Sequence, residues 1–454
     1  MNNEFLAKES IGKLLFKLSI PTVVAQLINM LYNLVDRIFI GHIAEIGDLA
    51  LTGVGVCLPL IMLVSAFASL VSAGGAPRAS IFMGKKDNTT AEKIMGNCFL
   101  LQIIISFVLT IILLVFNREL LLLFGASENT IEYAVEYMNV YAIGTLFVQL
   151  TLGMNAYITS QGFSKIAMIT VLIGALCNIA LDPIFIYVFN MGVSGAALAT
   201  IISQAISCLF VIVFLFSKKS VLKLKVSNFK LDFKIILPCM ALGLAPFIMQ
   251  SSECIIIVCF NTSLQNYGGD LAVGAMTILS SVMQFAMLPL QGFAQGAQPI
   301  SSYNFGAKNA DRVVKTFKLL LMICLIYSTT LYIVVMACPK IFVSMFTDKI
   351  ELIEFTAKAM RRYFMVLFVF GAQIACQMTF VSTGNAKSSI IVACARKFFL
   401  LLPLIYLMPA IMEDKTMAVY TAEPVADFLA VSFTVTLFIF QFKKSIKQLK
   451  STLN

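Results

Sequence analysis

Tyr32-Asn33-Leu34-Val35-Asp36-Arg37-Ile38-Phe39-Ile40-Gly41 closes the first long apolar segment of the chain. No residue from Leu18 to Val35 is charged, so a membrane helix through this segment carries Asp36 and Arg37 just below its outer end. An ionisable side chain inside a membrane costs roughly 2.5–3.5 kcal/mol on insertion scales, and it usually faces a bundle interior or a water-filled cavity. The stretch therefore predicts a membrane bundle built around a functional carboxylate.

The composition places the whole chain in the membrane class. Of its 454 residues, 59% are apolar and only 12% are charged, with a mean hydropathy of +0.92. Soluble domains carry about 25% charged residues. Uncharged runs such as Leu49–Pro77 and Leu271–Ala307 exceed the ~20 residues that cross a bilayer and lack the alternation of a membrane barrel. We expect an all-α integral membrane protein.

Twelve transmembrane helices are predicted from the apolar runs and the charged residues between them. Their approximate ranges are 14–41, 48–83, 94–116, 131–155, 165–188, 193–216, 235–262, 271–303, 314–337, 355–381, 388–411 and 418–442.

Basic and acidic loops alternate along the chain. The loops after the second, sixth and eighth spans and both ends of the chain are rich in Lys, whereas the other loops carry most of the acidic residues. By the positive-inside rule, both termini face the cytoplasm of a multi-pass cell-membrane protein. The same distribution accounts for the net charge of +10, so no nucleic-acid partner is expected.

An internal repeat divides the chain into halves. Gly47-Asp48-Leu49-Ala50 recurs as Gly269-Asp270-Leu271-Ala272, a shift of 222 residues (269 − 47). The same shift relates Gly74 to Gly296, Pro77 to Pro299, Ser80 to Ser302, Gly84 to Gly306, Gly162 to Gly384 and Lys165 to Lys387. Six spans per half insert in the same sense, which predicts two pseudo-symmetric six-helix lobes related by an axis along the membrane normal. The predicted lobes are 1–217 and 235–454, and we interpret the Lys-rich linker 218–234 as a solvated cytoplasmic loop.

Polar side chains of three spans in the first half share one depth. Asn178 and Asp182 are four residues apart, so they lie on one helix face. Counted at ~1.5 Å per residue, Asp36, Asp182 and Thr200 lie roughly 8–12 Å below the outer edge. These four side chains, Asn178 included, can therefore converge.

Two carboxylates with amide and hydroxyl oxygens suit a hard cation such as Na⁺. They suit a shared proton equally, because burial and like charge both favour the protonated carboxyl. Structural alternatives exist for each acid: Asp182-Pro183 could mark only a helix kink, and Asp36 could pair with a basic neighbour. Arg37 itself points elsewhere around the helix.

The second half contains further intramembrane charges. Glu253, in the seventh span, is a candidate for binding a cationic substrate or a second proton. Asp427 follows Glu423-Pro424 in the twelfth span. Arg396-Lys397 begins the eleventh span, and we expect both side chains to snorkel to the inner interface or to pair with tail groups.

No enzyme signature stands out. The chain contains neither a phosphate-binding P-loop motif nor an H-E-x-x-H zinc motif, and the eleven Cys are scattered without a C-x-x-C pair. No nucleophile–base pair or metal cluster can be placed at one depth. We therefore expect no enzymatic activity and no cofactor.

Five stretches carry a resemblance to a known family. Asp36–Gly41, Gly47–Ala50, Gln161-Gly162, Asn178 to Pro183 and Gly192–Ala197 resemble the multidrug and toxic compound extrusion (MATE) family, in its bacterial multidrug-export branch. The resemblance covers essentially the whole chain. It implies two six-helix lobes that open outwards as a V and export organic cations in exchange for Na⁺ or H⁺.

The resemblance also assigns residues. It implies that the cation site of the first lobe consists of Asp36, Asn178, Asp182 and Thr200, and that the first span bends at Pro21 when the carboxylate is protonated. Some members also use acids in spans seven and ten. Glu253 resembles the first of these, but Tyr363–Ala386 contains no Asp or Glu, which favours coupling in the first lobe.

The expected function is thus efflux of lipophilic organic cations by a monomer that contacts membrane lipids, with H⁺ or Na⁺ as the coupling ion. The alternative is a flippase for a lipid-linked glycan, which shares this architecture. A flippase would need a strongly basic cavity for pyrophosphate, whereas the intramembrane charges here are mostly acidic.

Overall fold

The computed structural model describes residues 4–44 and 46–451, and this part of the chain is helical without strands. Nine of its helices are long and apolar enough to cross a membrane, or eleven if each of two bent helix pairs counts as one span. One of the nine, α10 (Phe233–Gly306), consists of two helices that meet at Gly269, where φ is 62°. Counting α10 as two gives the twelve spans predicted from the sequence.

The first half contains spans one to six. Its helices are α1 (Phe5–Lys8), α2 (Ile11–Gly41), α3 (Gly47–Gly84), α4 (Asn88–Val115), α5 (Asn117–Leu123), α6 (Ile131–Ile143), α7 (Thr145–Ser160), α8 (Ser164–Pro183), the π-helical η1 (Ile184–Val188) and α9 (Gly192–Phe216). Helices α6 and α7 form one span that bends by 57°.

The second half repeats this order after the short η2 (Val226–Asn228). Following α10 come α11 (Ala310–Ala337), α12 (Pro339–Ser344), α13 (Ile350–Tyr363), η3 (Leu367–Val369), α14 (Phe370–Ser382), α15 (Ala386–Cys394), the π-helical η4 (Ala395–Leu401), α16 (Leu402–Ile411) and α17 (Lys415–Ser451). The bent span here joins α13 to the stretch that ends with α14, at 46°.

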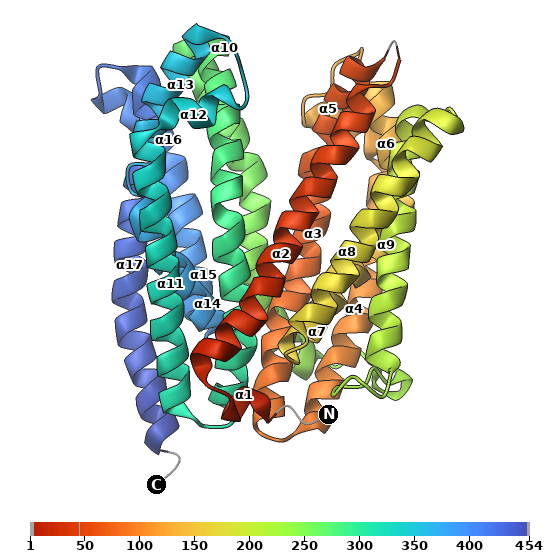
Figure 1. The fold of residues 1–454 in the computed structure, drawn as a ribbon, viewed down its shortest axis with the longest axis vertical. Helices are drawn as coiled ribbons and strands as arrows, with labels where there is room; N and C mark the ends of the chain where they lie inside the picture. The colour runs from red at the N-terminus through yellow and green to blue at the C-terminus, as the bar shows by residue number, and fades with distance from the viewer. Residues whose placement is uncertain (1–3, 45, 452–454) are drawn as a thin grey trace.

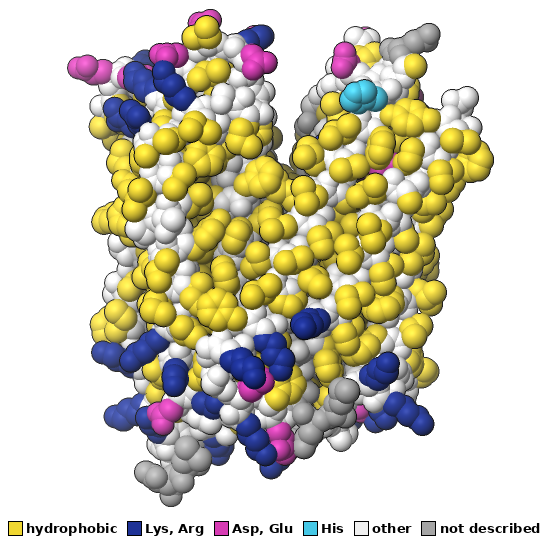
Figure 2. Space-filling view, in the orientation of Figure 1, with side chains coloured by type: hydrophobic (Ala, Val, Ile, Leu, Met, Phe, Trp, Pro, Cys, Tyr) yellow, Lys and Arg dark blue, Asp and Glu magenta, His cyan; other side chains and the backbone are white. Residues whose placement is uncertain are grey.

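The helices form two bundles, which we call the N lobe (α2–α9) and the C lobe (α10–α17). Figure 1 shows both chain termini at one end of the molecule and the two lobes parting at the other end. Figure 2 shows Lys and Arg gathered near the termini, apolar side chains along the middle, and a hollow between the lobes opposite the termini. We call the end that carries the termini the basic end.

Backbone conformations repeat with the sequence. Lys86 and Lys308, which are 222 residues apart, both have positive φ, at 63° and 59°. Gly162 and Gly384, separated by the same interval, have φ of 88° and 75°. Positive φ is rare for a residue with a Cβ, such as Lys. The matched Lys pair and the matched Gly pair therefore indicate that the two halves share these turn geometries.

The two lobes meet at the basic end through close backbone contacts. A Cβ built on Gly84 would lie 2.0 Å from the carbonyl oxygen of Tyr303, and a Cβ on Gly306 would lie 1.9 Å from that of Ile81. The repeat relates Gly84 to Gly306 and Ile81 to Tyr303, so the contact is the same from either lobe. Such a reciprocal contact indicates a pseudo-two-fold axis between the lobes.

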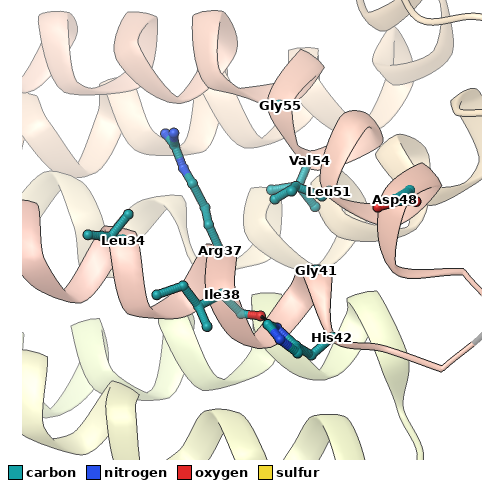
Figure 3. A pocket seen from close by; sticks show the side chains of 9 residues that line it. All are labelled: Leu34, Arg37, Ile38, Gly41, His42, Asp48, Leu51, Val54 and Gly55. Atoms are coloured by element: carbon teal, nitrogen blue, oxygen red, sulfur yellow. Dashed lines mark hydrogen bonds between the residues drawn. The ribbon is translucent and has the colours of Figure 1, made fainter. Parts of the chain in front are cut away.

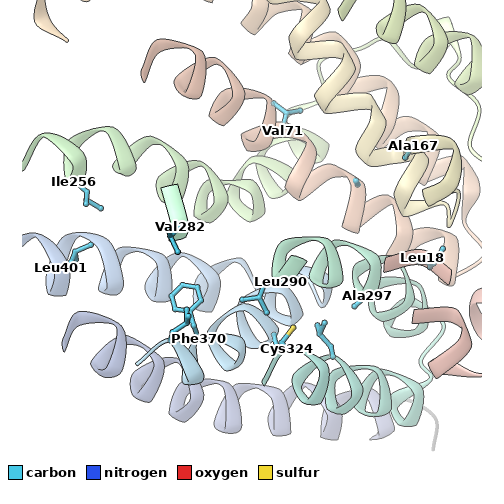
Figure 4. Packing of buried hydrophobic residues seen from close by; sticks show 14 of the residues in the cluster. Leu18, Val71, Ala167, Ile256, Val282, Leu290, Ala297, Cys324, Phe370 and Leu401 are labelled. Atoms are coloured by element: carbon cyan, nitrogen blue, oxygen red, sulfur yellow. The ribbon is translucent and has the colours of Figure 1, made fainter. Parts of the chain in front are cut away.

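The hydrophobic core is continuous across this contact. One cluster of buried apolar side chains includes Leu18 of α2 and Val71 of α3 together with Leu290 and Ala297 of α10 (Figure 4). Apolar burial and glycine-mediated approach thus hold the lobes together at the basic end.

The linker between the lobes is fastened to the N lobe. The backbone N–H groups of Val221 and Leu222 donate to Oε1 of Gln161, at 2.8 and 2.9 Å. Lys225 pairs with Glu92 at 2.5 Å, and Leu222 is fully buried. The expectation of a solvated loop is therefore wrong for this part of the linker, although its lysines are exposed.

Candidate functional site

Two carboxylates and an amide lie inside the N lobe between α2 and α8. Asp182 is fully buried, Asn178 is 1% exposed and Asp36 is 8% exposed. The amide of Asn178 donates to Oδ1 of Asp182 at 3.0 Å, as their spacing of four residues predicts. Helices α2 and α8 pack along each other, and the charges of Asp36 and Asp182 lie within electrostatic range.

Three oxygens of this group are buried and accept no hydrogen bond from the described residues. They are Oδ1 of Asp36, Oδ2 of Asp182 and Oδ1 of Asn178. A buried oxygen without a partner is costly, and an anionic one more so. A proton, a cation or water could satisfy these oxygens.

Two tyrosine side chains lie near the carboxylate of Asp36. Tyr32, one turn before Asp36 on α2, and Tyr137, a buried residue of α6, both lie within electrostatic range of Asp36. The spacing of four residues could have pointed to Tyr32, but nothing in the sequence linked Tyr137 to this site. Thr200 of α9 is half-buried and lies against Tyr137. Within the described part of the chain, no hydrogen bond joins Thr200 directly to either carboxylate.

The π-helical end of the fifth span is tied to α2. The hydroxyl of Tyr187 donates to the carbonyl oxygen of Phe39 at 2.7 Å, and the two rings meet edge to face. This contact lies between Asp36 and the outer end of α2 and holds α2 against η1.

Arg37 faces away from Asp36, as its position on the helix predicts. Its side chain lines a cavity of about 530 Å³ between α2 and α3, whose lining is mostly apolar and also includes His42 and Asp48 (Figure 3). Arg37 forms no ion pair with Asp36 among the described residues, although its charge lies within electrostatic range of that carboxyl.

The C lobe contains a second group of buried charges. Lys397 is 3% exposed and donates to Oε1 of Glu253. Arg396 is 5% exposed and donates to Asp427 at 2.7 Å and to Glu423 at 3.3 Å. The expectation that both bases snorkel to the inner interface is therefore wrong.

Arg396 and Lys397 remain buried because both have acidic partners inside the lobe. The acids of α17 and α10 lie at the depth of η4, so ion pairing inside the lobe replaces the route to water. The guanidinium of Arg396 also stacks over the ring of Phe370, 4.7 Å from its centroid.

Pro21 lies in the part of α2 that contacts the C lobe. Around it, the hydroxyl of Thr22 donates to the carbonyl oxygen of Gly292 at 2.6 Å, and a Cβ on Gly296 would meet the backbone of Ser19. The half of α2 near the basic end is thus fastened to the C lobe, whereas the half that carries Asp36 packs on α8 of the N lobe. Helix α2 is continuous through Pro21.

Comparison with known proteins gives one consistent picture. The MatE family model matches residues 21–184 and 244–407, once in each half. The curated relatives include the multidrug export protein MepA of Staphylococcus haemolyticus (strain JCSC1435), 24% identical over 436 residues and covering 95% of both chains. MepA of Staphylococcus aureus (strain MSSA476) is 23% identical over 407 residues, which cover 90% of this chain and 89% of the relative.

Solved structures share the fold. One, described as an outward-facing conformation of a multidrug resistance MATE family transporter, matches with a TM-score of 0.91 at 22% identity over 99% of both chains. A MATE crystal structure in a bent conformation matches with the same score and identity over 100% of this chain and 99% of the other. The chain is a multi-pass membrane protein and belongs to the MatE family, the multidrug and toxic compound extrusion transporters.

Proposed function

We propose that the protein is a secondary antiporter that exports lipophilic organic cations in exchange for H⁺ or Na⁺. The proposed coupling site consists of Asp36, Asn178, Asp182 and Thr200. The MatE family consists of transporters, and relatives named as multidrug exporters span nearly the whole chain.

The observation that carries this proposal is the set of unpartnered oxygens on Asp36, Asn178 and Asp182. A proton on one carboxyl would remove a charge and supply a hydrogen-bond donor between the two acids. A Na⁺ ion would draw on the same three oxygens, because small hard cations prefer oxygen ligands. Either ion satisfies the site, and neither requires a resident cofactor.

The exchange cycle follows from the position of the site. Ions reach the carboxylates while the lobes are parted at the end opposite the basic end. Their arrival neutralises Asp36 and lowers the affinity for a cationic substrate. The lobes then rock about the pseudo-two-fold axis, release the ion at the basic end and accept substrate there.

Pro21 serves as the hinge of this cycle. Proline removes a backbone hydrogen bond from a helix and so provides a bending point. Because α2 contacts the C lobe around Pro21, at Thr22 and Gln26, and packs on α8 nearer Asp36, movement of one lobe against the other stresses α2, with Pro21 as its bending point.

The orientation follows from the positive-inside rule. The Lys-rich linker and both termini lie at the basic end, which we assign to the cytoplasm of a cell-membrane protein working as a monomer. Its partners are small-molecule organic cations and membrane lipids. Glu253 is the candidate for a second substrate or proton site in the C lobe.

A glycan-lipid flippase is the less favoured function. Such a protein needs basic side chains free to bind pyrophosphate, but Arg396 and Lys397 are buried and paired with carboxylates. Their positive charge is therefore not available to an anionic head group.

Ethidium efflux from proteoliposomes tests the proposal. The expected result is efflux driven by an imposed pH gradient or by an imposed Na⁺ gradient, and its loss in Asp36→Asn. Each pH unit supplies about 1.4 kcal/mol per proton, enough for tenfold accumulation. Efflux by Asp36→Asn at the wild-type rate would refute the assigned coupling site, and efflux without either gradient would refute antiport.

A further inference from the structure

The repeat allows the two lobes to be compared position by position. Under the shift of 222 residues, Asp36 corresponds to Val258, Asn178 to Leu400, Asp182 to Leu404 and Thr200 to Ala422. The C lobe is thus apolar at the positions that form the N-lobe site.

The C lobe instead carries charge on the same three repeat-related spans. Glu253 lies on α10, Arg396 and Lys397 on η4, and Glu423 and Asp427 on α17. Glu253 precedes Val258 by five residues (258 − 253) and Arg396 precedes Leu400 by four (400 − 396). On α17, which runs towards the basic end, Glu423 follows Ala422 by one residue and Asp427 follows it by five (427 − 422), so all of these charges lie on the basic side of the equivalents of the N-lobe site. We call these five residues the C-lobe ion cluster.

The cluster contains one more acid than base. Arg396 is shared between Glu423 and Asp427, and Lys397 is engaged with Glu253. Glu423 also lies within electrostatic range of Lys397. Glu423 is held beside η4 by Arg396, the neighbour of Lys397 in the chain, and we take it as the second carboxylate for the Lys397 ammonium; a transfer from Glu253 to Glu423 would leave no base unpaired.

Glu253 is the accessible member of the cluster. Its side chain is 40% exposed, whereas those of Arg396 and Lys397 are 6% and 3% exposed. On the surface of α10 it lies between Gln250, which contacts Ser69 of α3 at 3.3 Å, and the buried Ile256. Glu253 thus borders the space between the lobes.

The neighbourhood also suits an apolar cation that carries aromatic rings. Two turns towards the basic end, Phe247 of α10 meets Phe67 of α3 edge to face across the lobes, with centroids 5.0 Å apart. Aromatic faces attract cations and provide apolar contact area.

We propose that Glu253 binds a monovalent organic cation from the space between the lobes, and that Lys397 is a tethered competitor for the same carboxylate. When the ligand binds, the ammonium of Lys397 moves to Glu423, and the added charge brings the cluster from a net −1 to neutrality. This inference rests on the proposed export of organic cations but not on the assignment of the coupling site.

Binding of tetraphenylphosphonium to the purified full-length protein, measured by isothermal titration calorimetry at one pH, tests the proposal. This probe has a permanent charge, so its ionisation does not vary. Lys397→Met frees Glu253 and should tighten binding by about tenfold, whereas Glu253→Gln should weaken it by about tenfold. In the double variant, Lys397→Met should have no effect beyond that of Glu253→Gln.

The control is Lys318→Met, which removes an exposed positive charge of α11 outside the cluster and should leave the affinity unchanged. Unchanged or weaker binding in folded Lys397→Met would overturn the proposal. If Lys397→Met does not fold, the Glu253→Gln variant tests the proposal by itself. Wild-type affinity for tetraphenylphosphonium in Glu253→Gln would overturn the proposal. An Asp36→Asn background separates the two claims: the response to Lys397→Met persists there whether or not Asp36 is the coupling residue.

Discussion

At the scale of single residues, the N-lobe site depends on how few hydrogen bonds its carboxylates receive. Asp182 accepts one from Asn178, and Oδ1 of Asp36 accepts none from the described residues. A carboxylate surrounded by donors would hold its charge permanently, whereas one with unpartnered oxygens can gain and lose a proton or a cation. We expect this scarcity of hydrogen bonds to let the two acids exchange a proton or a cation.

Asn178→Ala removes the one donor that the structure gives to Asp182. A hydrogen bond to a charged group contributes about 1.5–3 kcal/mol, so we expect a lower Tm and weaker gradient-driven efflux. Because the chain has no Trp and its eleven Cys are free, a thiol-reactive dye can report unfolding. Asn33→Ala is the matched control, since Asn33 is exposed and bonds only to its own helix. Equal Tm values for the two variants would contradict this role of Asn178.

At the scale of single helices, two equivalent caps differ in charge. Asp87 caps α4 by accepting from the N–H of Thr90 at 3.0 Å, and Asn309 caps α11 by accepting from that of Arg312 at 3.3 Å. The two residues are 222 positions apart. The hydrogen bonds from Thr90 hold the pKa of Asp87 below its usual range.

This difference predicts that the contribution of the α4 cap depends on pH and that the contribution of the α11 cap does not. A lowered pKa adds stability above the pKa of the unfolded chain, and this stability is lost as the pH falls through the folded-state value. The Tm loss caused by Asp87→Ala should therefore shrink on acidification. Asn309→Ala should lower the free energy of unfolding by about 0.5–2 kcal/mol, and the resulting Tm loss should not shrink on acidification. Thermal unfolding at several pH values tests this, and parallel pH profiles would contradict it.

Pro21→Ala restores a backbone donor in the part of α2 that contacts the C lobe. The variant should bind substrate with unchanged affinity but turn over more slowly, because a stiffer α2 resists the bend that accompanies rocking. Efflux rates and equilibrium binding measured on the same preparation separate these effects. A wild-type rate in Pro21→Ala would show that α2 does not bend there.

At the scale of the whole molecule, the reciprocal contact of Gly84 and Gly306 closes the basic end. Gly84→Val places side-chain atoms against the carbonyl of Tyr303, so the lobes should part there and the inward-open population should rise. Spin labels at the exposed Lys93 and Lys315, in a Cys-free background, measure the separation of α4 from α11. Gly55→Val is the control, because no atom lies within 4 Å of its Cβ. An unchanged distance distribution in Gly84→Val would argue against this seal.

The fold was largely predictable because membrane spans follow from hydropathy and the repeat follows from turn residues. The exception is the loop expected between spans seven and eight, where α10 continues as helix up to Gly269. Polar residues such as Asn261 and Gln265 are compatible with either conformation, and only the positive φ of Gly269 ends the helix.

The site was predictable only in part. The spacing of Asn178 and Asp182 and the depth of Asp36 gave the N-lobe group. The sequence did not indicate Tyr137, because its proximity to Asp36 depends on how α6 packs against α3 and α9. The sequence did not indicate the pairing of Arg396 with Glu423 and Asp427 for the same reason. The spacing of four residues between these two acids places them on one helix face and could have indicated a shared partner.

Ion movement driven by substrate tests the central claim most directly. Proteoliposomes are given an ethidium gradient with no initial ion gradient, while luminal pH and ²²Na⁺ uptake are recorded. The account predicts that substrate flux drives H⁺ or Na⁺ the opposite way, that Asp36→Asn abolishes this countermovement, and that Asp270→Asn, at the surface, preserves it. Wild-type countermovement in Asp36→Asn, or substrate flux with neither ion moving, would contradict the account.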